Sequence, residues 1–294
     1  MKKQKAGFVA VIGPTNAGKS TLINELVGAK VSIVSSKVQT TRTSINGIFN
    51  YENSQIVLID TPGVFTAKSR LERSMVATAY ASLGRANAVL LVLDANQTYR
   101  KDVDTIIKRI GDINVPVFVA INKVDNIEKS KLLKIAQDLF AKYPFKEVFM
   151  ISAKKNIGLD ELKRALSQIL PEQPWFFSAD EVSDFPLKLF AAEMVREQIY
   201  KNLHQELPYS ITVEPEKVEK QDYGYDFNMI IYVLRDTQKK IIIGKNGTML
   251  EKIGASARKE LQKELGVKVK LFLFVKAKPD VFEDGEFYEN WGMR

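Results

Sequence analysis

The sequence predicts an α/β domain with a doubly wound, mostly parallel sheet, followed by a smaller α+β domain. From residue 6 to about residue 170, apolar strand patterns alternate with helical patterns, as in a parallel sheet covered by helices on both faces. The alternation stops at a polar, proline-containing stretch, and the elements beyond it follow a different order. A chain of 294 residues with 45% hydrophobic content can bury two cores of this kind.

The first domain is expected to place its functional residues in the loops that follow its strands. Strands are predicted at 8–12, 55–59, 115–121 and 148–151, since each is a short apolar run bounded by polar or glycine-containing turns. A helix is expected to open near Gly18. Ligands of doubly wound folds bind outside the carboxyl ends of such strands, so the loops after these runs are the candidates.

The loop after the first strand fills every fixed position of the phosphate-binding pattern GxxxxGK[ST], as Gly13-Pro14-Thr15-Asn16-Ala17-Gly18-Lys19-Ser20. Its glycines let backbone N–H groups turn toward phosphate oxygens, Lys19 adds charge at the β and γ phosphates, and Ser20 can ligate magnesium. The positive end of the following helix, which continues with Thr21, points at the same anion. An ordinary glycine-rich turn would leave Lys19 and Ser20 solvated, whereas the complete pattern predicts a bound nucleoside triphosphate with Mg2+.

Two polar loops are predicted to respond to the γ phosphate. In Asp60-Thr61-Pro62-Gly63, Asp60 can hold the magnesium shell through water, and the Gly63 N–H can meet the γ phosphate. In Gln39-Thr40-Thr41-Arg42, a threonine hydroxyl, assigned to Thr41, would be a second protein ligand of the metal. Loss of the γ phosphate would release both loops.

The residues that read the base are expected in two loops after later strands. Asn122-Lys123-Val124-Asp125 follows the run at 115–121, and the Asp125 carboxylate can accept two hydrogen bonds that guanine offers and adenine does not. Lys123 can lay its stem over the base plane. In Ser152-Ala153-Lys154, a backbone N–H can donate to the guanine carbonyl while repelling the amino group of adenine. Together the two loops predict GTP binding rather than ATP binding.

These motifs, in this order, resemble those of the bacterial Era-type GTPases of the TrmE-Era-EngA-like class. The resemblance implies an enzyme that converts GTP to GDP and phosphate, and it gives catalytic roles to a set of residues comprising Asn16, Lys19, Thr41, Asp60 and Gly63.

One departure from the better-known small GTPases is Val64, which follows Gly63 where those proteins carry a glutamine that orients the attacking water. Asn16 is similar to the asparagine with which relatives sharing the Thr-Thr-Arg run hold K+ beside the phosphates. Potassium would then supply charge that an arginine finger supplies elsewhere. The alternative is that Asn16 only stabilises a tight turn.

The second domain is expected after a linker at 171–184. A helix is predicted from about Leu187 to Glu206, and strands are predicted at 210–218 and 227–234 with a turn at 222–224 between them. An amphipathic helix then presents one apolar stripe, and a third strand at 267–275 closes the unit. The stripe consists of Leu250, Ile253, Ala257, Leu261 and Leu265.

Between two helices of this domain lies Gly244-Lys245-Asn246-Gly247, the GxxG turn that is typical of KH domains. Its glycines let a nucleic-acid backbone approach closely, Lys245 would meet phosphate, and Asn246 would meet phosphate or sugar. Ile241, Ile242 and Ile243 are expected to form an apolar floor under unstacked bases, with Lys252 and Arg258 along the next helix. Because of these neighbours, an ordinary exposed turn is disfavoured, and single-stranded RNA is the expected ligand.

The composition excludes several other classes of function. With no cysteine, the chain has no disulfide, thiolate nucleophile or cysteine-based zinc site. The single histidine, His204, is expected to be structural. There is no apolar run of about 18 residues, and the start of the chain leads into a core strand without a cleavable signal. A cytoplasmic location is therefore expected.

The basic charge of the chain is not in the predicted RNA-binding domain. Residues 1–180 carry 25 Lys and Arg against 16 Asp and Glu, whereas residues 181–294 carry 18 against 19. Basic side chains of the second domain gather around the GxxG turn, which makes recognition depend on stacking and base edges. The positive first domain is expected to touch rRNA or an anionic membrane surface, or to be a plain solvated exterior.

The resemblance to Era-type GTPases covers essentially the whole chain, including the run Gln205-Glu206-Leu207-Pro208-Tyr209-Ser210. It implies a monomer that acts in assembly of the small (30S) ribosomal subunit, with the KH domain binding near the 3′ end of 16S rRNA, and with peripheral contact to the inner membrane. Two alternatives stay open: a nucleotide-driven RNA-remodelling enzyme, and an RNA-binding module with a non-catalytic nucleotide site. The tail at 279–294 is expected to be either frayed or docked through its aromatic residues.

Overall fold

The computed structural model describes residues 3–35, 37, 40–98, 101–111, 113–203 and 210–292, and the chain divides into two compact units. The first comprises the chain up to Ser32 together with Thr41–Asp184. The second comprises Ile33–Thr40 together with Phe185–Gly292. The segment Ile33–Thr40, called the tether segment below, was expected in the first domain. By its contacts it groups with the second unit instead, because its described polar groups are hydrogen-bonded to a helix of that unit.

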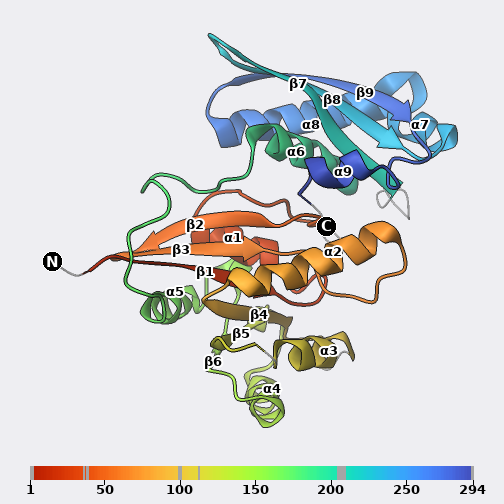
Figure 1. The fold of residues 1–294 in the computed structure, drawn as a ribbon. Coiled ribbons are helices and arrows are strands. Elements are labelled where there is room, and N and C mark those ends of the chain that lie inside the picture. Colours follow the sequence, from red (N-terminus) through yellow and green to blue (C-terminus); the bar gives the residue numbers. More distant parts are fainter. Residues whose placement is uncertain are drawn as a thin grey trace. The chain divides into compact units, whose positions relative to one another are not determined.

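The first unit is built on one six-stranded sheet with the strand order β2-β3-β1-β4-β5-β6 (Figure 1). Strand β2 runs antiparallel to β3, and all other neighbours are parallel, which confirms the mostly parallel sheet. The strands are β1 Lys5–Ile12, β2 Ile45–Tyr51, β3 Ser54–Asp60, β4 Ala88–Asp94, β5 Val117–Asn122 and β6 Glu147–Met150. The helices are α1 Lys19–Val27, α2 Arg70–Ala81, α3 Lys101–Ile110, α4 Lys129–Lys142 and α5 Leu159–Gln168, with short 3-10 turns at Ser82–Arg85, Val124–Asn126 and Ala153–Lys155.

Both faces of this sheet are covered by helices, as the doubly wound prediction requires. Alternate residues of β1 point to opposite faces, so that Val9 and Val11 join one core while Ala10 and Ile12 join the other. The first core also holds the apolar faces of α1 and α5, and the second holds those of α2, α3 and α4. The loops after the parallel strands therefore meet at one edge of the sheet.

The stretch at 171–184, predicted as a linker, is packed along the first unit. The Gln55 side chain accepts the N–H groups of Phe176 and Phe177 at 2.9 Å each and donates to the Phe177 carbonyl. The Phe176 ring stacks on Phe8 with 5.0 Å between the ring centroids. Since an extended backbone offers donors and acceptors at regular spacing, this stretch pairs with groups at the sheet instead of remaining a free connection.

The second unit has a three-stranded sheet in the order β7-β8-β9, with β7 antiparallel to β8 and β8 parallel to β9 (Figure 1). Its elements are α6 Leu187–Asn202, β7 Ile211–Gln221, β8 Gly224–Val233, α7 Asp236–Ile243, α8 Thr248–Leu265, β9 Lys268–Ala277 and α9 Gly285–Asn290, with a 3-10 turn at Lys245–Gly247. On α8, Ile253, Ala257 and Leu261 are fully buried. The fully buried part of the predicted stripe is therefore shorter than expected, because Leu250 and Leu265 at its ends are only half-buried.

The described part of the tail is folded rather than frayed. Phe287, Tyr288 and Trp291 are buried, and the Tyr288 hydroxyl donates to the Phe282 carbonyl at 2.7 Å. The helix predicted from about Leu187 to Glu206 ends at Asn202, because Leu203 is already extended. Other predictions lie outside the described residues: the role of His204, the run at 205–209, and Gln39. Within the described ranges, no helix is both long and apolar enough to cross a bilayer.

Candidate nucleotide and nucleic-acid sites

The phosphate-binding loop has a shape that only glycine permits at two positions. A Cβ on Gly13 would lie 2.2 Å from the Val92 carbonyl oxygen. Gly18 has φ 94°, and a Cβ there would lie 2.3 Å from Asn122 Nδ2. Helix α1 begins at Lys19, and among the described residues no side chain caps its first turn. Its N–H groups are thus available to an anion bound in the loop.

Lys19 is a buried cation inside this loop. Its ammonium donates to the Gly13 carbonyl at 3.0 Å and to the Pro14 carbonyl at 2.9 Å. Burial lowers the pKa of Lys19 from 10.5 to about 8, and the nearby Asp60 carboxylate opposes this only in part. A phosphate group beside the ammonium favours its charged form, so nucleotide binding should raise this pKa.

Proton uptake on nucleotide binding is the expected result of this arrangement. Above pH 8 the free protein holds Lys19 mostly neutral, and the bound phosphates recharge it. Binding then takes up a fraction of a proton that approaches one near pH 9, and the affinity for GTP falls as the pH rises. Calorimetry at pH 9 in two buffers of different ionisation enthalpy measures this uptake. The same uptake in a Lys19→Met variant would contradict the assignment.

Three hydroxyl groups converge on the Asp60 carboxylate, and these residues are called the Asp60 cluster. Ser32 Oγ donates to Asp60 Oδ2 at 2.6 Å, and Ser20 Oγ donates to it at 2.9 Å. Thr41 Oγ1 lies 2.9 Å from Ser20 Oγ and 3.5 Å from Asp60 Oδ2. Sequence reasoning expected Ser20, Thr41 and Asp60 here, and the structure brings all three together.

The Asp60 cluster fits a magnesium ion. Burial raises the pKa of Asp60, although hydrogen bonds from Ser32, Ser20 and Thr41 and the charge of Lys19 lower it. Its Oδ1 atom is buried without a hydrogen-bond partner among the described residues. Hydroxyl and carboxylate oxygens are the ligands that Mg2+ prefers, and an ion or its water would satisfy the orphaned oxygen. Ser20 and Thr41 are the residues that would hold the ion.

The Asp60-Thr61-Pro62-Gly63 loop lies directly against the phosphate-binding loop. The Thr61 hydroxyl donates to the Val11 carbonyl at 2.7 Å, and the Val64 N–H donates to the Gly13 carbonyl at 3.1 Å. A Cβ on Gly63 would lie 2.7 to 3.0 Å from atoms of Thr15. The Val64 side chain is buried, so it cannot orient an attacking water. The two loops are therefore in direct contact, and Gly63 lies against the phosphate-binding loop.

The predicted base-reading loops are also held together by hydrogen bonds. Asn122 Nδ2 donates to the Ala17 carbonyl at 3.0 Å, and its Oδ1 accepts the Ala153 N–H at 3.0 Å. The Lys123 ammonium donates to the Asn16 carbonyl and to Asp94 Oδ2, both at 2.7 Å. Asn122 thus ties the phosphate loop to both base-reading loops.

Asp125 is ready to accept hydrogen bonds. Its side chain is exposed, and a hydrogen bond from the Ser152 hydroxyl, then the charges of Lys155 and Lys154, lower its pKa despite slight desolvation. An ionised carboxylate is an acceptor only, which suits the two donors on the guanine edge. The arrangement is what a guanine-reading pocket requires.

The GxxG turn is exposed and needs both of its glycines. Gly244 has φ 74°, and a Cβ there would lie 2.7 to 2.9 Å from Met249. Gly247 has φ 80°, which a side chain rarely adopts. Lys245 and Asn246 between them are exposed, as are Lys252 and Arg258 on α8. A negatively charged backbone can therefore approach this turn closely.

The predicted apolar floor of the RNA groove is wrong for one residue. Ile241, Ile242 and Ile243 form the last turn of α7, and the Ile242 side chain is fully buried. Ile241 is 52% exposed and Ile243 is half-buried. Successive residues of a helix point about 100° apart, so three in a row cannot share one surface. Only Ile241 and Ile243 remain candidates for contact with bases.

Several functional candidates were missed by sequence reasoning. Ser32 completes the Asp60 cluster, and Asp94 pairs with Lys123. Phe272 and Phe274 on β9 are 46% and 49% exposed, alternating along the strand with side chains that face the helices. Asp94 ends an apolar run, a signal that could have found it. Ser32 carries no local signal, because its contact with Asp60 spans 28 residues.

The fold and these two sites define a P-loop GTPase joined to a KH domain. A family model described as a 50S ribosome-binding GTPase matches residues 8–123, and a KH domain model matches residues 206–281. GTPase Era of Mesorhizobium japonicum is 47% identical over 289 residues, covering 98% of this chain and 93% of that protein. GTPase Era of Afipia carboxidovorans is 46% identical over 290 residues, covering 98% and 94%. The chain belongs to the Era family of GTPases, and it is a GTPase.

Two solved structures match the whole chain. Era of Aquifex aeolicus, a point variant bound to GDP.AlF4-, is 39% identical with a TM-score of 0.94 and covers 98% of this chain and 99% of that one. Era in complex with MgGDPNP and nucleotides 1506-1542 of 16S ribosomal RNA is 39% identical with a TM-score of 0.93, at the same coverage.

Proposed function

We propose that this GTPase is a switch that binds single-stranded RNA near the 3′ end of 16S rRNA and acts in assembly of the small ribosomal subunit. Its membership in the Era family supports this, as does the similar structure solved with MgGDPNP and 16S rRNA nucleotides. The same structure supports Mg2+ as the ion of the Asp60 cluster. The observation that supports a switch is that the tether segment follows the nucleotide site along the chain and is hydrogen-bonded to the KH unit.

The tether segment is bound to helix α6 by polar contacts. The Val34 N–H donates to Glu197 Oε1 at 3.0 Å, and the Arg196 guanidinium donates to the Thr40 carbonyl. The Lys37 ammonium donates to the carbonyls of Tyr200 and Leu203 at the end of α6. Cations are favoured at a helix carboxyl end, where the last carbonyls lack partners.

These contacts rest on charged residues that are almost completely buried in α6. Although burial alone would lower the pKa of Arg196, the neighbouring Glu193 carboxylate raises it. Arg196 Nε donates to Glu193 Oε1 at 2.7 Å. The next residue after Thr40 is Thr41, whose hydroxyl belongs to the Asp60 cluster. Recruitment of Thr41 to a bound metal would therefore pull on a segment that α6 holds, which couples the nucleotide to the KH unit.

The chemistry of hydrolysis is assigned to residues of the first unit. Lys19 would neutralise charge on the β and γ phosphates, and the Gly63 N–H would bind the γ phosphate. Magnesium, when bound, offsets the charge that develops on the transferred phosphoryl group. Because Val64 cannot orient water, we expect slow turnover without a further charge near Asn16, which has φ 62° in the phosphate loop.

Turnover is expected to be faster in potassium than in sodium, by about tenfold or more at equal ionic strength, if an ion near Asn16 supplies that charge. An Asn16→Ala variant should lose this difference while keeping its slow rate in sodium. GTP hydrolysis measured in KCl and NaCl buffers of equal ionic strength shows whether turnover depends on potassium. Identical rates in the two salts would leave Asn16 as a residue that only stabilises the loop.

The coupling is tested by measuring RNA affinity in two nucleotide states. The probe is a single-stranded RNA with the 3′ sequence of the organism's own 16S rRNA, and its complement is the control RNA. The affinity should differ several-fold between the complexes with GDPNP and with GDP, and RNA should change the GDPNP affinity by the same factor. Equal affinities in the two states would contradict the switch.

A Lys37→Ala variant should bring the two RNA affinities closer together, because it removes the link between the tether segment and the end of α6. Lys188→Ala is the matched control, since Lys188 is an exposed residue on the same helix. An unchanged ratio in Lys37→Ala would show that the coupling does not use the contact of Lys37 with the end of α6.

The location of the protein is part of the same proposal. A cytoplasmic monomer with peripheral contact to the membrane is supported by the basic charge of residues 1–180 and by the family resemblance. Flotation with anionic and with neutral vesicles tests this contact, and no difference between the two would oppose it. The remodelling alternative has no additional catalytic cluster in the described part of the second unit to favour it.

A further inference from the structure

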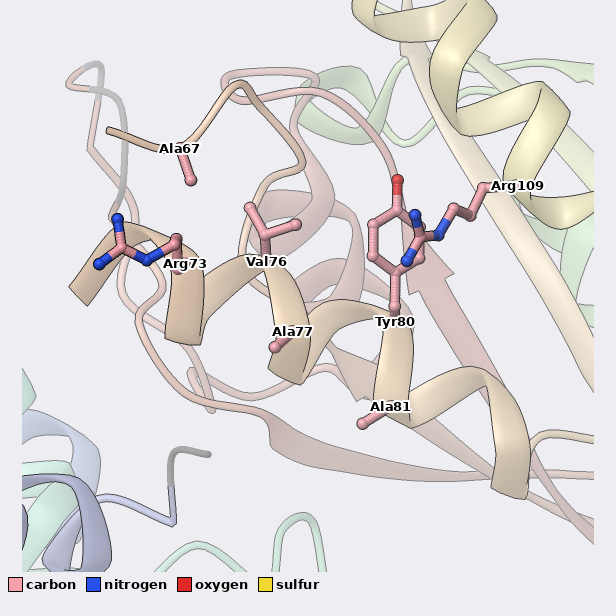
Figure 2. A pocket seen from close by; sticks show the side chains of 7 residues that line it. All are labelled: Ala67, Arg73, Val76, Ala77, Tyr80, Ala81 and Arg109. Atoms are coloured by element: carbon pink, nitrogen blue, oxygen red, sulfur yellow. The ribbon is translucent and has the colours of Figure 1, made fainter. Parts of the chain in front are cut away.

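The first unit has a groove whose lining residues belong neither to the nucleotide site nor to the GxxG turn. It lies between α2 and α3 and has a volume of about 490 Å3. Figure 2 shows Arg73, Val76, Ala77, Tyr80 and Ala81 along one side of α2, with Arg109 of α3 reaching across to Tyr80. The guanidinium carbon of Arg109 lies 4.5 Å from the Tyr80 ring centroid.

The groove occupies the outer side of α2, where polar residues are expected. The inner side holds Leu71, Met75 and Ala79, all of them buried. A helix on a protein surface normally turns its polar face to water, but here the outer face has an aliphatic and aromatic centre. Ala77 and Ala81 are exposed and Val76 and Tyr80 are half-buried, so a side chain from a partner can pack among them.

Arginines stand at both ends of the apolar centre. Arg73 and Arg109 are exposed, and neither has a carboxylate within ion-pair distance among the described residues. The one acidic residue in the first turn of α2, Glu72, is engaged in the capping box with Ser69. Arg109 is also held in place by the Tyr80 ring, so its charge is positioned before a partner arrives.

This combination fits a protein segment better than a nucleic acid. The one aromatic ring among the lining residues, Tyr80, is covered by the Arg109 guanidinium and is therefore not a free stacking platform for a base. Val76, Ala77 and Ala81 provide packing surface but no hydrogen bonds. The two guanidinium groups can each bind a carboxylate in bidentate fashion. A chain segment with an aliphatic or aromatic side chain between acidic residues would satisfy both features.

We propose that the groove between α2 and α3 is a docking site for an acidic segment of a protein partner, with an apolar side chain seated over Ala77. Helix α2 begins seven residues after Gly63, in the stretch that leads out of the γ-phosphate loop. Binding of the segment is therefore coupled to the nucleotide, and by reciprocity it changes the affinity for GTP.

The experiment selects 12-residue peptides from a random display library on the full-length protein loaded with GDPNP. Enriched peptides should carry at least two Asp or Glu residues around an aliphatic or aromatic residue. The most enriched peptide, synthesised with a fluorophore, should bind the unmodified protein at least tenfold more tightly than the Arg73→Glu/Arg109→Glu variant. Its affinity should differ between the GDPNP and GDP complexes, and equal affinities would remove the coupling.

Two further variants keep the test decisive. Ala77→Gln fills the groove without changing its charge and should weaken the peptide by a similar factor. Lys108→Glu is the matched control, because Lys108 is exposed on α3 but does not line the groove. Peptides that bind all variants equally would overturn the proposal. A 12-residue oligouridine RNA is tested in parallel. The proposal would also be overturned if this RNA, and not the selected peptides, bound the Arg73→Glu/Arg109→Glu variant more weakly than the unmodified protein.

Discussion

Replacing Lys19 with methionine should lower kcat/KM for GTP by about a thousandfold or more. The methionine keeps the unbranched apolar stem of the side chain but removes the ammonium, the charge that the phosphate loop would direct at the β and γ phosphates. Single-turnover hydrolysis with saturating enzyme measures the effect on chemistry, and calorimetry measures the effect on binding. Lys134→Met, an exposed residue on α4, is the control. A loss of less than tenfold would remove Lys19 from the catalytic machinery.

The same variant should be more stable than the unmodified protein when no nucleotide is present. A lysine whose pKa is lowered from 10.5 to about 8 by burial destabilises the folded state at neutral pH, by on the order of 3 kcal/mol. This destabilisation is complete below pH 8 and disappears as the pH rises toward 10.5. Between these values the unfolded chain still carries the Lys19 proton, whereas the folded protein has lost it. Urea unfolding at pH 7 should show the gain, and the same concentration of nucleotide should stabilise the unmodified protein more than the variant.

Charge reversal of the GxxG turn should lower the affinity for single-stranded RNA about a hundredfold at moderate salt. In the Lys245→Asp/Asn246→Asp variant, two exposed side chains that would face the RNA backbone become negative. Both glycines remain, so the turn keeps its shape, and GTP hydrolysis without RNA should not change. Fluorescence anisotropy with the 16S-derived probe measures the affinity across a salt series.

Lys220→Asp/Gln221→Asp in the β7–β8 hairpin is the matched control for this variant, because both residues are exposed in the same unit and the two variants change the net charge equally. If the control and the GxxG variant weakened RNA equally, the net charge of the unit would explain binding better than the turn. Unchanged affinity in the GxxG variant would place the RNA elsewhere on the unit, for example along Phe272 and Phe274 of β9.

The parts of the site that sequence predicted well are local. Gly18, Lys19 and Ser20 lie in one continuous loop at the start of α1, so their spacing alone was enough to predict the shape of that loop. Asp60 and Asn122 were placed correctly because they end apolar runs, and the carboxyl ends of parallel strands meet at one edge. The doubly wound fold was also predicted correctly, because alternating strand and helix patterns allow few arrangements.

The errors concern residues whose role depends on a neighbour distant in sequence. The buried position of Ile242 depends on how α7 packs, and a pattern of three isoleucines does not show which one faces inward. The stretch at 171–184 was predicted as a linker in which Trp175-Phe176-Phe177 packs against one domain, and the structure agrees with this packing, but the sequence did not show which residue it contacts. Its binding partner is Gln55, more than 120 residues earlier in the chain.

The sequence by itself determined the motifs from which the chemistry is predicted: a phosphate loop, a carboxylate suited to guanine and a GxxG turn, because each is encoded by a few adjacent residues. Only the tertiary structure decided which residues support them and how they are linked. It brought Ser32 to Asp60, grouped Ile33–Thr40 with the second unit, and left an apolar groove between two arginines. The physical reason is that packing fixes contacts across the chain, whereas motifs fix only the order of groups along it.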